Sequence, residues 1–179
     1  TLIIITFSFA FIAQEEKRLA LVIGNANYDK GALKNPVNDA ALIKQTLEKL
    51  NFDVIYATNL ESKRSMVDKI AEFGRKRGDF ELGLVYYAGH GVQVAGENYL
   101  LPTKEIFESD YDVEDYGVSV QKIMRYLNGT NQQLNILILD ACRDNPFEEN
   151  WNSSQTISGR FHQELNENNI ISGNFYIQK

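Results

Sequence analysis

The sequence has few of the residues that build metal centres and disulfides. Its 179 residues include one cysteine and two histidines. A single cysteine excludes an internal disulfide and a multi-thiolate zinc site, and two histidines leave little material for any other metal centre. Net positive charge is lacking as well, because 18 basic and 24 acidic side chains give −6. General nucleic-acid and anionic-membrane surfaces need clustered Lys and Arg, so we expect no nucleic-acid partner.

Long hydrophobic runs are almost absent, and the one at residues 1–13 is too short to span a bilayer, which needs about 20 residues. Its length suits the apolar core of a secretory signal, and Ser8 and Ala10 are spaced like a cleavage site. We interpret residues 1–17 as a clipped signal-peptide region and linker, which predicts a periplasmic or extracellular protein without a stable membrane span. The alternative is a buried first strand, which would favour a cytoplasmic protein.

The remainder has the composition of one globular domain, with 44% hydrophobic and 23% charged residues. Short, continuous apolar runs predict strands over 19–24, 52–57, 82–88 and 135–139. Helical spacing, with Pro36 in a first turn and Ser119 as a cap, predicts helices over 36–50, 62–73 and 119–127. Residues 92–101 predict a hairpin that turns at 95–98. The fold class is therefore α/β, with a mostly parallel sheet of at least four strands, helices on both faces and a small hairpin.

Two segments have other compositions. Residues 148–179 are polar and rich in Asn, Gln and Ser, and they predict loop with at most one short strand at 174–177. The basic residues 75–77, before Gly78, are typical of a helix C-terminus favoured by the helix dipole.

Candidate functional residues follow three of the predicted strands. His90 lies between two glycines after the third strand, Asp140 and Cys142 follow the fourth, and the loop after the first leads to Asp39. Parallel sheets bind ligands beyond the carboxyl ends of their strands, so we expect these side chains to meet. A thiolate beside an imidazole is the minimum for nucleophilic attack on an acyl carbon. Alone, the cysteine would be read as a packed hydrophobic residue and the histidine as a satisfied core residue; together at strand ends they favour a functional site.

These residues carry a family resemblance. The segments YYAGHG (86–91) and DACRDNPF (140–147) place the cysteine 52 positions after the histidine, close to the separation of about 50 known for caspases. With LALVIGNANY (19–28), LKNPVNDA (33–40) and GENYLLP (96–102), the chain resembles the caspase-like cysteine peptidases, especially bacterial metacaspase-type members.

The resemblance spans residues 18–147, which it marks as a catalytic domain. It implies that His90 and Cys142 form the catalytic dyad and that the backbone N–H groups of Gly91 and Cys142 form the oxyanion hole. Family members usually continue with further strands and a Gly-rich loop that complete the substrate cleft. Here the resemblance fades after Phe147, and the divergent tail at 148–179 does not supply two convincing strands.

Charge predicts the substrate. Caspases read Gln-Ala-Cys around the nucleophile, whereas this chain reads Asp140-Ala141-Cys142. Asp140 and Asp39 together would attract an Arg or Lys side chain and repel an Asp, and the resemblance to metacaspases, which cleave after basic residues, agrees. The alternatives are a helix N-terminal acid for Asp39 and a strand-end loop acid for Asp140. We expect a peptide or protein substrate with a basic residue before the scissile bond.

A cofactor is not required by this chemistry. An acidic run suggests calcium, which some metacaspases need and which takes several oxygen ligands; its members are Glu105, Glu108, Asp110, Asp112, Glu114 and Asp115. Their spacing matches no defined calcium loop, and a solvated acidic surface is the commoner explanation.

Three function classes therefore remain: a cysteine endopeptidase that cleaves after Arg or Lys, a caspase-like binding or scaffolding module without activity, and another cysteine hydrolase or transferase that acts on small amides.

Overall fold

The computed structural model describes residues 16–127 and 134–142, with the backbone but not the side chain of Cys142. The N-terminal run up to residue 15, the tail that follows Cys142 and the possible strand at 174–177 lie outside the described residues. The elements in chain order are β1 (Arg18–Gly24), α1 (Pro36–Lys49), β2 (Phe52–Thr58), α2 (Lys63–Lys76), the 3-10 turn η1 (Arg77–Asp79), β3 (Leu82–Val94), β4 (Glu97–Leu100), α3 (Asp110–Tyr116), β5 (Val118–Ser119), α4 (Val120–Leu127) and β6 (Leu134–Cys142).

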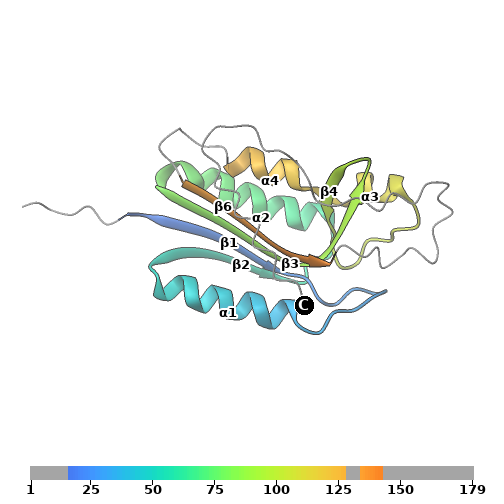
Figure 1. Cartoon of the computed structure of the whole chain (residues 1–179), viewed down its shortest axis with the longest axis horizontal. Coiled ribbons are helices and arrows are strands. Elements are labelled where there is room, and N and C mark those ends of the chain that lie inside the picture. Colours follow the sequence, from blue (N-terminus) through green and yellow to red (C-terminus); the bar gives the residue numbers. More distant parts are fainter. Residues whose placement is uncertain (1–15, 128–133, 143–179) are drawn as a thin grey trace, which may run out of the picture.

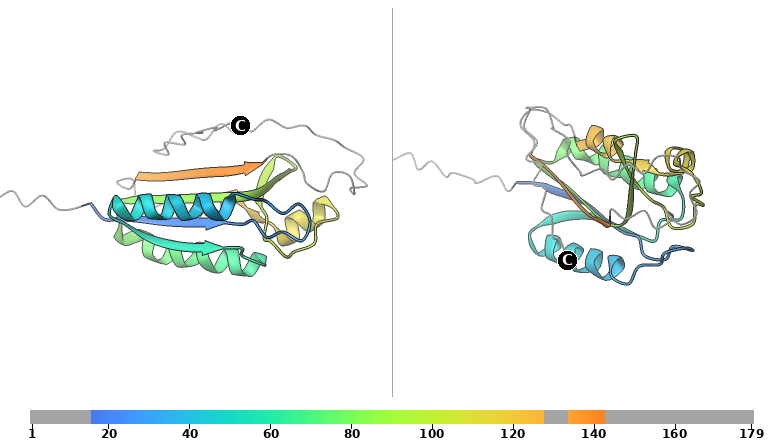
Figure 2. Two further views of the ribbon diagram at one scale, coloured as in Figure 1. Left: turned by 90° about the horizontal axis from the view of Figure 1, so that it is seen from below. Right: turned by 45° about the vertical axis from the view of Figure 1, so that its right-hand side comes forward.

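The four long strands form a parallel sheet in the order β2-β1-β3-β6. Their arrows point the same way in Figure 2, with β6 at the upper edge of the left view. The last four residues of β3, 91–94, pair antiparallel with β4, which pairs antiparallel with β5. The predicted α/β class, the mostly parallel sheet and the hairpin after the third strand are confirmed.

Helices cover both faces of this sheet, as predicted. Figure 1 shows α1 below the sheet and α2 and α4 above it. Because β1 lies between two strands and two helical layers, its residues Leu19–Val22 are fully buried, which explains its continuous apolar sequence. None of the described helices is long and apolar enough to cross a membrane.

The start of α1 is held against the carboxyl end of β1. Pro36 occupies the first turn, where its missing N–H costs nothing. A Cβ on Gly24 would lie 2.5 Å from the Pro36 carbonyl oxygen, so the helix approaches the strand closely because residue 24 is glycine. This packing brings Asp39, in the first turn of α1, to the carboxyl edge of the sheet.

The hairpin begins earlier than the sequence predicts. β3 runs without interruption from Leu82 to Val94, and the turn at Ala95 and Gly96 has φ values of 49° and 82°. Two consecutive positive φ values match the twist of the strands that they join. Ser119, the predicted helix cap, directly precedes α4 and is also part of β5, where it pairs with Tyr99 and its hydroxyl donates to Glu97.

The acidic run contains a short helix, α3, that the sequence analysis missed. Its cap is Ser109, whose hydroxyl accepts a hydrogen bond from the N–H of Asp112. Acids in a first turn are favoured by the helix dipole, and Asp110 and Asp112 both lie there. Helix geometry therefore accounts for part of the charge that suggested a calcium ligand set.

Residues 75–77 lie at the C-terminus of α2, as predicted, with Arg77 as its C-cap, but Arg77 also has a buried role that the sequence did not indicate. Arg75 and Lys76 are exposed in the last turn of α2, whereas Arg77 is 2% exposed. Its guanidinium donates to the Asn135 side chain and to the carbonyl oxygens of Phe80 and Leu134. Arg77 therefore connects the end of α2 to the start of β6.

Candidate active site

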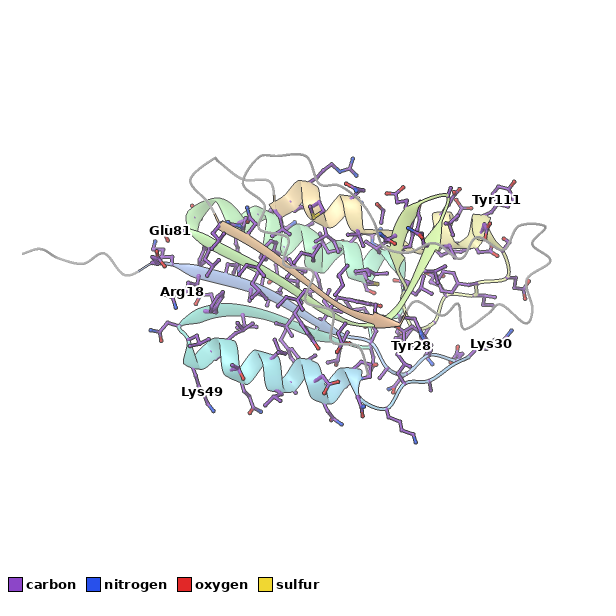
Figure 3. All side chains as sticks on the ribbon, in the orientation of Figure 1. Arg18, Tyr28, Lys30, Lys49, Glu81 and Tyr111 are labelled. Carbon is purple, nitrogen blue, oxygen red and sulfur yellow. The ribbon has the colours of Figure 1, made fainter. Side chains whose placement is uncertain are left out.

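The predicted site residues lie at the carboxyl ends of neighbouring strands. His90 on β3 and Cys142 on β6 are Cα partners in the parallel ladder. The loop after β1 lies at the same end, where Figure 3 labels Tyr28 and Lys30. The backbone convergence predicted for His90 and Cys142 is therefore present, while the Cys142 side chain lies outside the described residues.

The His90 imidazole is held in one tautomer. The ring is buried, and its Nε2 lies 2.6 Å from the Gly31 carbonyl oxygen. A carbonyl oxygen can only accept, so Nε2 carries the proton and Nδ1 of the neutral ring keeps its lone pair. Nδ1 is itself buried and has no hydrogen-bond partner among the described residues. A buried polar atom without a partner costs stability, so it is typical of a functional position.

Burial also sets the charge of this ring. It lowers the pKa of His90 below the ordinary value of 6.5, and the hydrogen bond to the Gly31 carbonyl opposes this shift in part. The imidazole is therefore neutral at neutral pH, the state in which Nδ1 can take a proton.

Two tyrosines fix the backbone of His90. The Tyr28 hydroxyl accepts the His90 backbone N–H at 2.9 Å, and the two ring centroids lie 4.4 Å apart. The Tyr87 hydroxyl donates to the His90 carbonyl oxygen at 2.8 Å. Burial raises the pKa of Tyr28 to about 12, so its hydroxyl stays protonated. A Cβ on Gly89 would lie 2.6 Å from both hydroxyl oxygens, so only glycine leaves room for this arrangement.

Neither tyrosine has a role that the sequence predicts. Both lie within segments that carried the family resemblance, but an alternating or apolar pattern does not reveal which hydroxyl reaches which backbone group. The sequence shows that Gly89 precedes His90, but it does not show that this position requires glycine.

The two acids predicted to bind substrate approach one buried phenol. The Tyr86 hydroxyl donates to Oδ2 of Asp140 at 3.3 Å. Burial raises the pKa of Tyr86, and the charges of Asp140 and Asp39 raise it further. Asp140 is exposed at the end of β6 and Asp39 is half-buried in α1, so two carboxylates flank this part of the edge.

The backbone of Gly91 has the direction that an oxyanion hole on the β6 side requires. The His90 carbonyl accepts from the Leu101 N–H just past β4, and a trans peptide directs its C=O and N–H to opposite sides. The Gly91 N–H therefore points away from β4, toward the side of β3 on which β6 pairs.

Residues 16–127 and 134–142 contain no group of three or more His, Cys, Asp or Glu side chains that could hold a metal ion. In α3, Asp112 accepts from Ser109 and from the Glu108 N–H, and these bonds lower its pKa. Its carboxylate is thus already engaged as part of the helix start.

Comparisons with known proteins give one family match and two relatives. The sequence model of the family described as "Caspase domain" matches residues 17–173. The human protein "Mucosa-associated lymphoid tissue lymphoma translocation protein 1" is 32% identical over 127 residues, which are 70% of this chain and 15% of the human protein. The mouse homologue is 31% identical over the same length and shares. The chain therefore matches a small part of each of these larger proteins.

Proposed function

The chain belongs to the caspase-domain family of peptidases, and from that premise we propose that it is a cysteine endopeptidase that uses His90 and Cys142 and cleaves after Arg or Lys. The observation that carries the proposal is His90 Nδ1, which is buried, has no hydrogen-bond partner among the described residues, and lies on a strand whose Cα partner at this position is Cys142. A cysteine nucleophile needs a proton acceptor that is held close to its thiol.

The proposed reaction follows from that tautomer. The Cys142 thiol gives its proton to His90 Nδ1, and the resulting thiolate attacks the scissile carbonyl. The imidazolium then protonates the leaving amine, which leaves an acyl-thioester on Cys142. Water, deprotonated by Nδ1, hydrolyses the thioester and restores the thiol. The N–H groups of Gly91 and Cys142 are proposed to donate to the oxyanion in both steps, and the direction of the Gly91 N–H supports this role.

Specificity for a basic residue is proposed from Asp39 and Asp140. Their charges act on the same Tyr86 hydroxyl, which supports a shared pocket, and a guanidinium can bridge two carboxylates. The resemblance to metacaspase-type members points to the same substrate class.

The test is cleavage of two fluorogenic peptides that differ only in an Arg or an Asp before the reporter group. Wild type should cleave the Arg peptide and not the Asp peptide, and Cys142→Ala should cleave neither. Asp140→Asn should lose about ten- to a hundredfold in kcat/KM on the Arg peptide, because a hydrogen bond between charged groups contributes about 1.5–3 kcal/mol. Assays with calcium and with EDTA determine whether an ion is needed.

Failure of wild type to cleave any basic peptide would contradict the enzyme proposal and favour a binding or scaffolding module. Equal activity of wild type and Asp140→Asn would contradict only the proposed acidic pocket and would leave the enzyme proposal in place.

We also propose that residues 1–13 direct export, since their apolar run suits a signal sequence. Expression in a bacterial host with and without these residues tests this: only the longer chain should reach the periplasm. Deletion should leave Tm unchanged, and a fall of several degrees would indicate that the run packs on the domain.

A further inference from the structure

The Tyr86 side chain connects the interior of the sheet to its charged rim. Tyr86 is 5% exposed, and it packs among the apolar residues that face α1. In the β3–β6 ladder Tyr86 is paired with Ile138, and Asp140 lies two residues farther along β6. The phenol therefore reaches diagonally from the buried face to an exposed carboxylate at the strand end, where its hydroxyl contacts Oδ2.

The direction of this hydrogen bond is fixed by charge. Burial and the two nearby acids raise the pKa of Tyr86, so its hydroxyl keeps its proton and donates to the carboxylate. A carboxylate has two oxygens, and a donor that engages Oδ2 restrains the plane of the group while Oδ1 keeps its full capacity to accept.

We propose that Tyr86 is a specificity-determining positioning residue: its hydroxyl holds Asp140 in the orientation that receives a guanidinium, so the pocket prefers Arg to Lys. This inference rests on the proposed function and names the preferred side chain within the basic class. Tyr86 acts through Asp140 and makes no contact with the reacting atoms.

Arg depends on carboxylate orientation more than Lys does. Its planar guanidinium presents parallel N–H groups that match a carboxylate only when the two planes are aligned. The Lys ammonium is a compact charge with rotatable donors, so it tolerates a carboxylate that turns. Loss of the Tyr86 hydroxyl should therefore reduce Arg cleavage more than Lys cleavage.

The experiment measures kcat/KM for two peptides that differ only in Arg or Lys before the scissile bond. Tyr86→Phe should lose about three- to tenfold on the Arg peptide and less than about twofold on the Lys peptide, so the Arg-to-Lys ratio narrows. A residue with a purely structural role would lower both activities together and leave the ratio unchanged.

The matched control is Tyr56→Phe, the same deletion on β2 in the same apolar cluster, which should keep the wild-type ratio. In an Asp140→Asn background, Tyr86→Phe should have no further effect on the ratio, because the hydroxyl would have no carboxylate to orient. Asp140→Glu leaves Tyr86 in place and displaces the carboxylate by one methylene, so it should also narrow the ratio. Urea unfolding of each variant reports its stability.

Benzamidine, a small amidinium probe, separates this inference from the proposed function. Wild type should bind it, and Tyr86→Phe should bind it about three- to tenfold more weakly by calorimetry. If wild type cleaves the Arg peptide but Tyr86→Phe leaves the Arg-to-Lys ratio unchanged, the inference is overturned and the proposed function stands, whatever Asp140→Glu does. If wild type neither cleaves a basic peptide nor binds benzamidine, both are overturned.

Discussion

Two buried polar side chains, Arg77 and His90, lie at opposite ends of the β3–β6 strand pair and have different surroundings. At the amino end, Arg77 is 2% exposed and each of its three side-chain nitrogens donates at least one hydrogen bond. At the carboxyl end, His90 is 4% exposed, and its Nδ1 has no partner among the described residues. Removing a buried cation that donates to several buried acceptors destabilises a fold, whereas a buried nitrogen without a partner lowers stability and is available for chemistry.

This comparison predicts opposite phenotypes at the two ends, and the largest effect is on activity. His90→Gln should lower kcat/KM on the Arg peptide by about 10²- to 10⁴-fold, the usual contribution of a general base. Stability should be retained, because the Gln amide still offers a donor to the Gly31 carbonyl. The urea midpoint measured beside the activity checks both, and a variant that loses stability but keeps activity would reverse the assignment.

At the amino end the effect should be on stability. Arg77→Met removes the hydrogen bonds that the guanidinium donates to the Asn135 side-chain oxygen and two carbonyl oxygens, so the free energy of unfolding should fall by about 3 kcal/mol or more. kcat/KM per folded molecule should stay within about twofold of wild type, since the site lies at the opposite end of the strands. Arg75→Met, an exposed neighbour on α2, is the control and should change stability by less than about 0.5 kcal/mol.

Two glycines on β3 sharpen the same contrast. A Cβ on Gly83 would lie 2.2 Å from Arg77 Nε, and one on Gly89 would lie 2.6 Å from the Tyr28 and Tyr87 hydroxyls. Gly83→Ala should lower the free energy of unfolding by about 1–3 kcal/mol through overpacking and leave kcat unchanged. Gly89→Ala should also lower kcat, because it displaces the tyrosines that hold His90. Equal kcat in the two variants would argue against a positioning role for those tyrosines.

The smallest expected effect is the pH dependence of stability. The pKa of folded His90 lies below the value of 6.5 that it has when unfolded, so between these values the unfolded chain binds more protons. Stability from this group is therefore present above about pH 6.5 and falls as the pH drops toward the folded pKa. The His90→Gln variant lacks the imidazole that takes up this proton. Its urea midpoints at pH 7.5 and 5.5 should therefore differ less than those of wild type. An identical difference would contradict a buried neutral imidazole.

The sequence predicted those parts of the fold that repeat a simple pattern. Continuous apolar strands such as β1 could be identified because a strand covered on both faces must be apolar throughout. The convergence of His90 and Cys142 followed from the rule that parallel strands end at one edge. Helix α3 was missed, since seven residues give too little periodicity and its acids suggested a surface instead.

The site's supporting residues could not be predicted in the same way. Arg77, Tyr28 and Tyr86 form hydrogen bonds to residues that lie 58, 62 and 54 positions away in the sequence. No local pattern encodes a contact of that separation. The basic character of Arg77 pointed to a helix dipole, and only the packing of Asn135 against it reveals a buried structural role.

The most direct test of the central claim, that His90 activates Cys142, is the rate of iodoacetamide alkylation of native protein as a function of pH. The chain has one cysteine, so a single mass increase reports Cys142 alone. We predict reaction of the folded protein with a midpoint below about 8.5, the pKa of a free thiol, and a shift to higher pH in His90→Gln. Labelling that requires unfolding, or identical profiles for wild type and His90→Gln, would contradict the dyad.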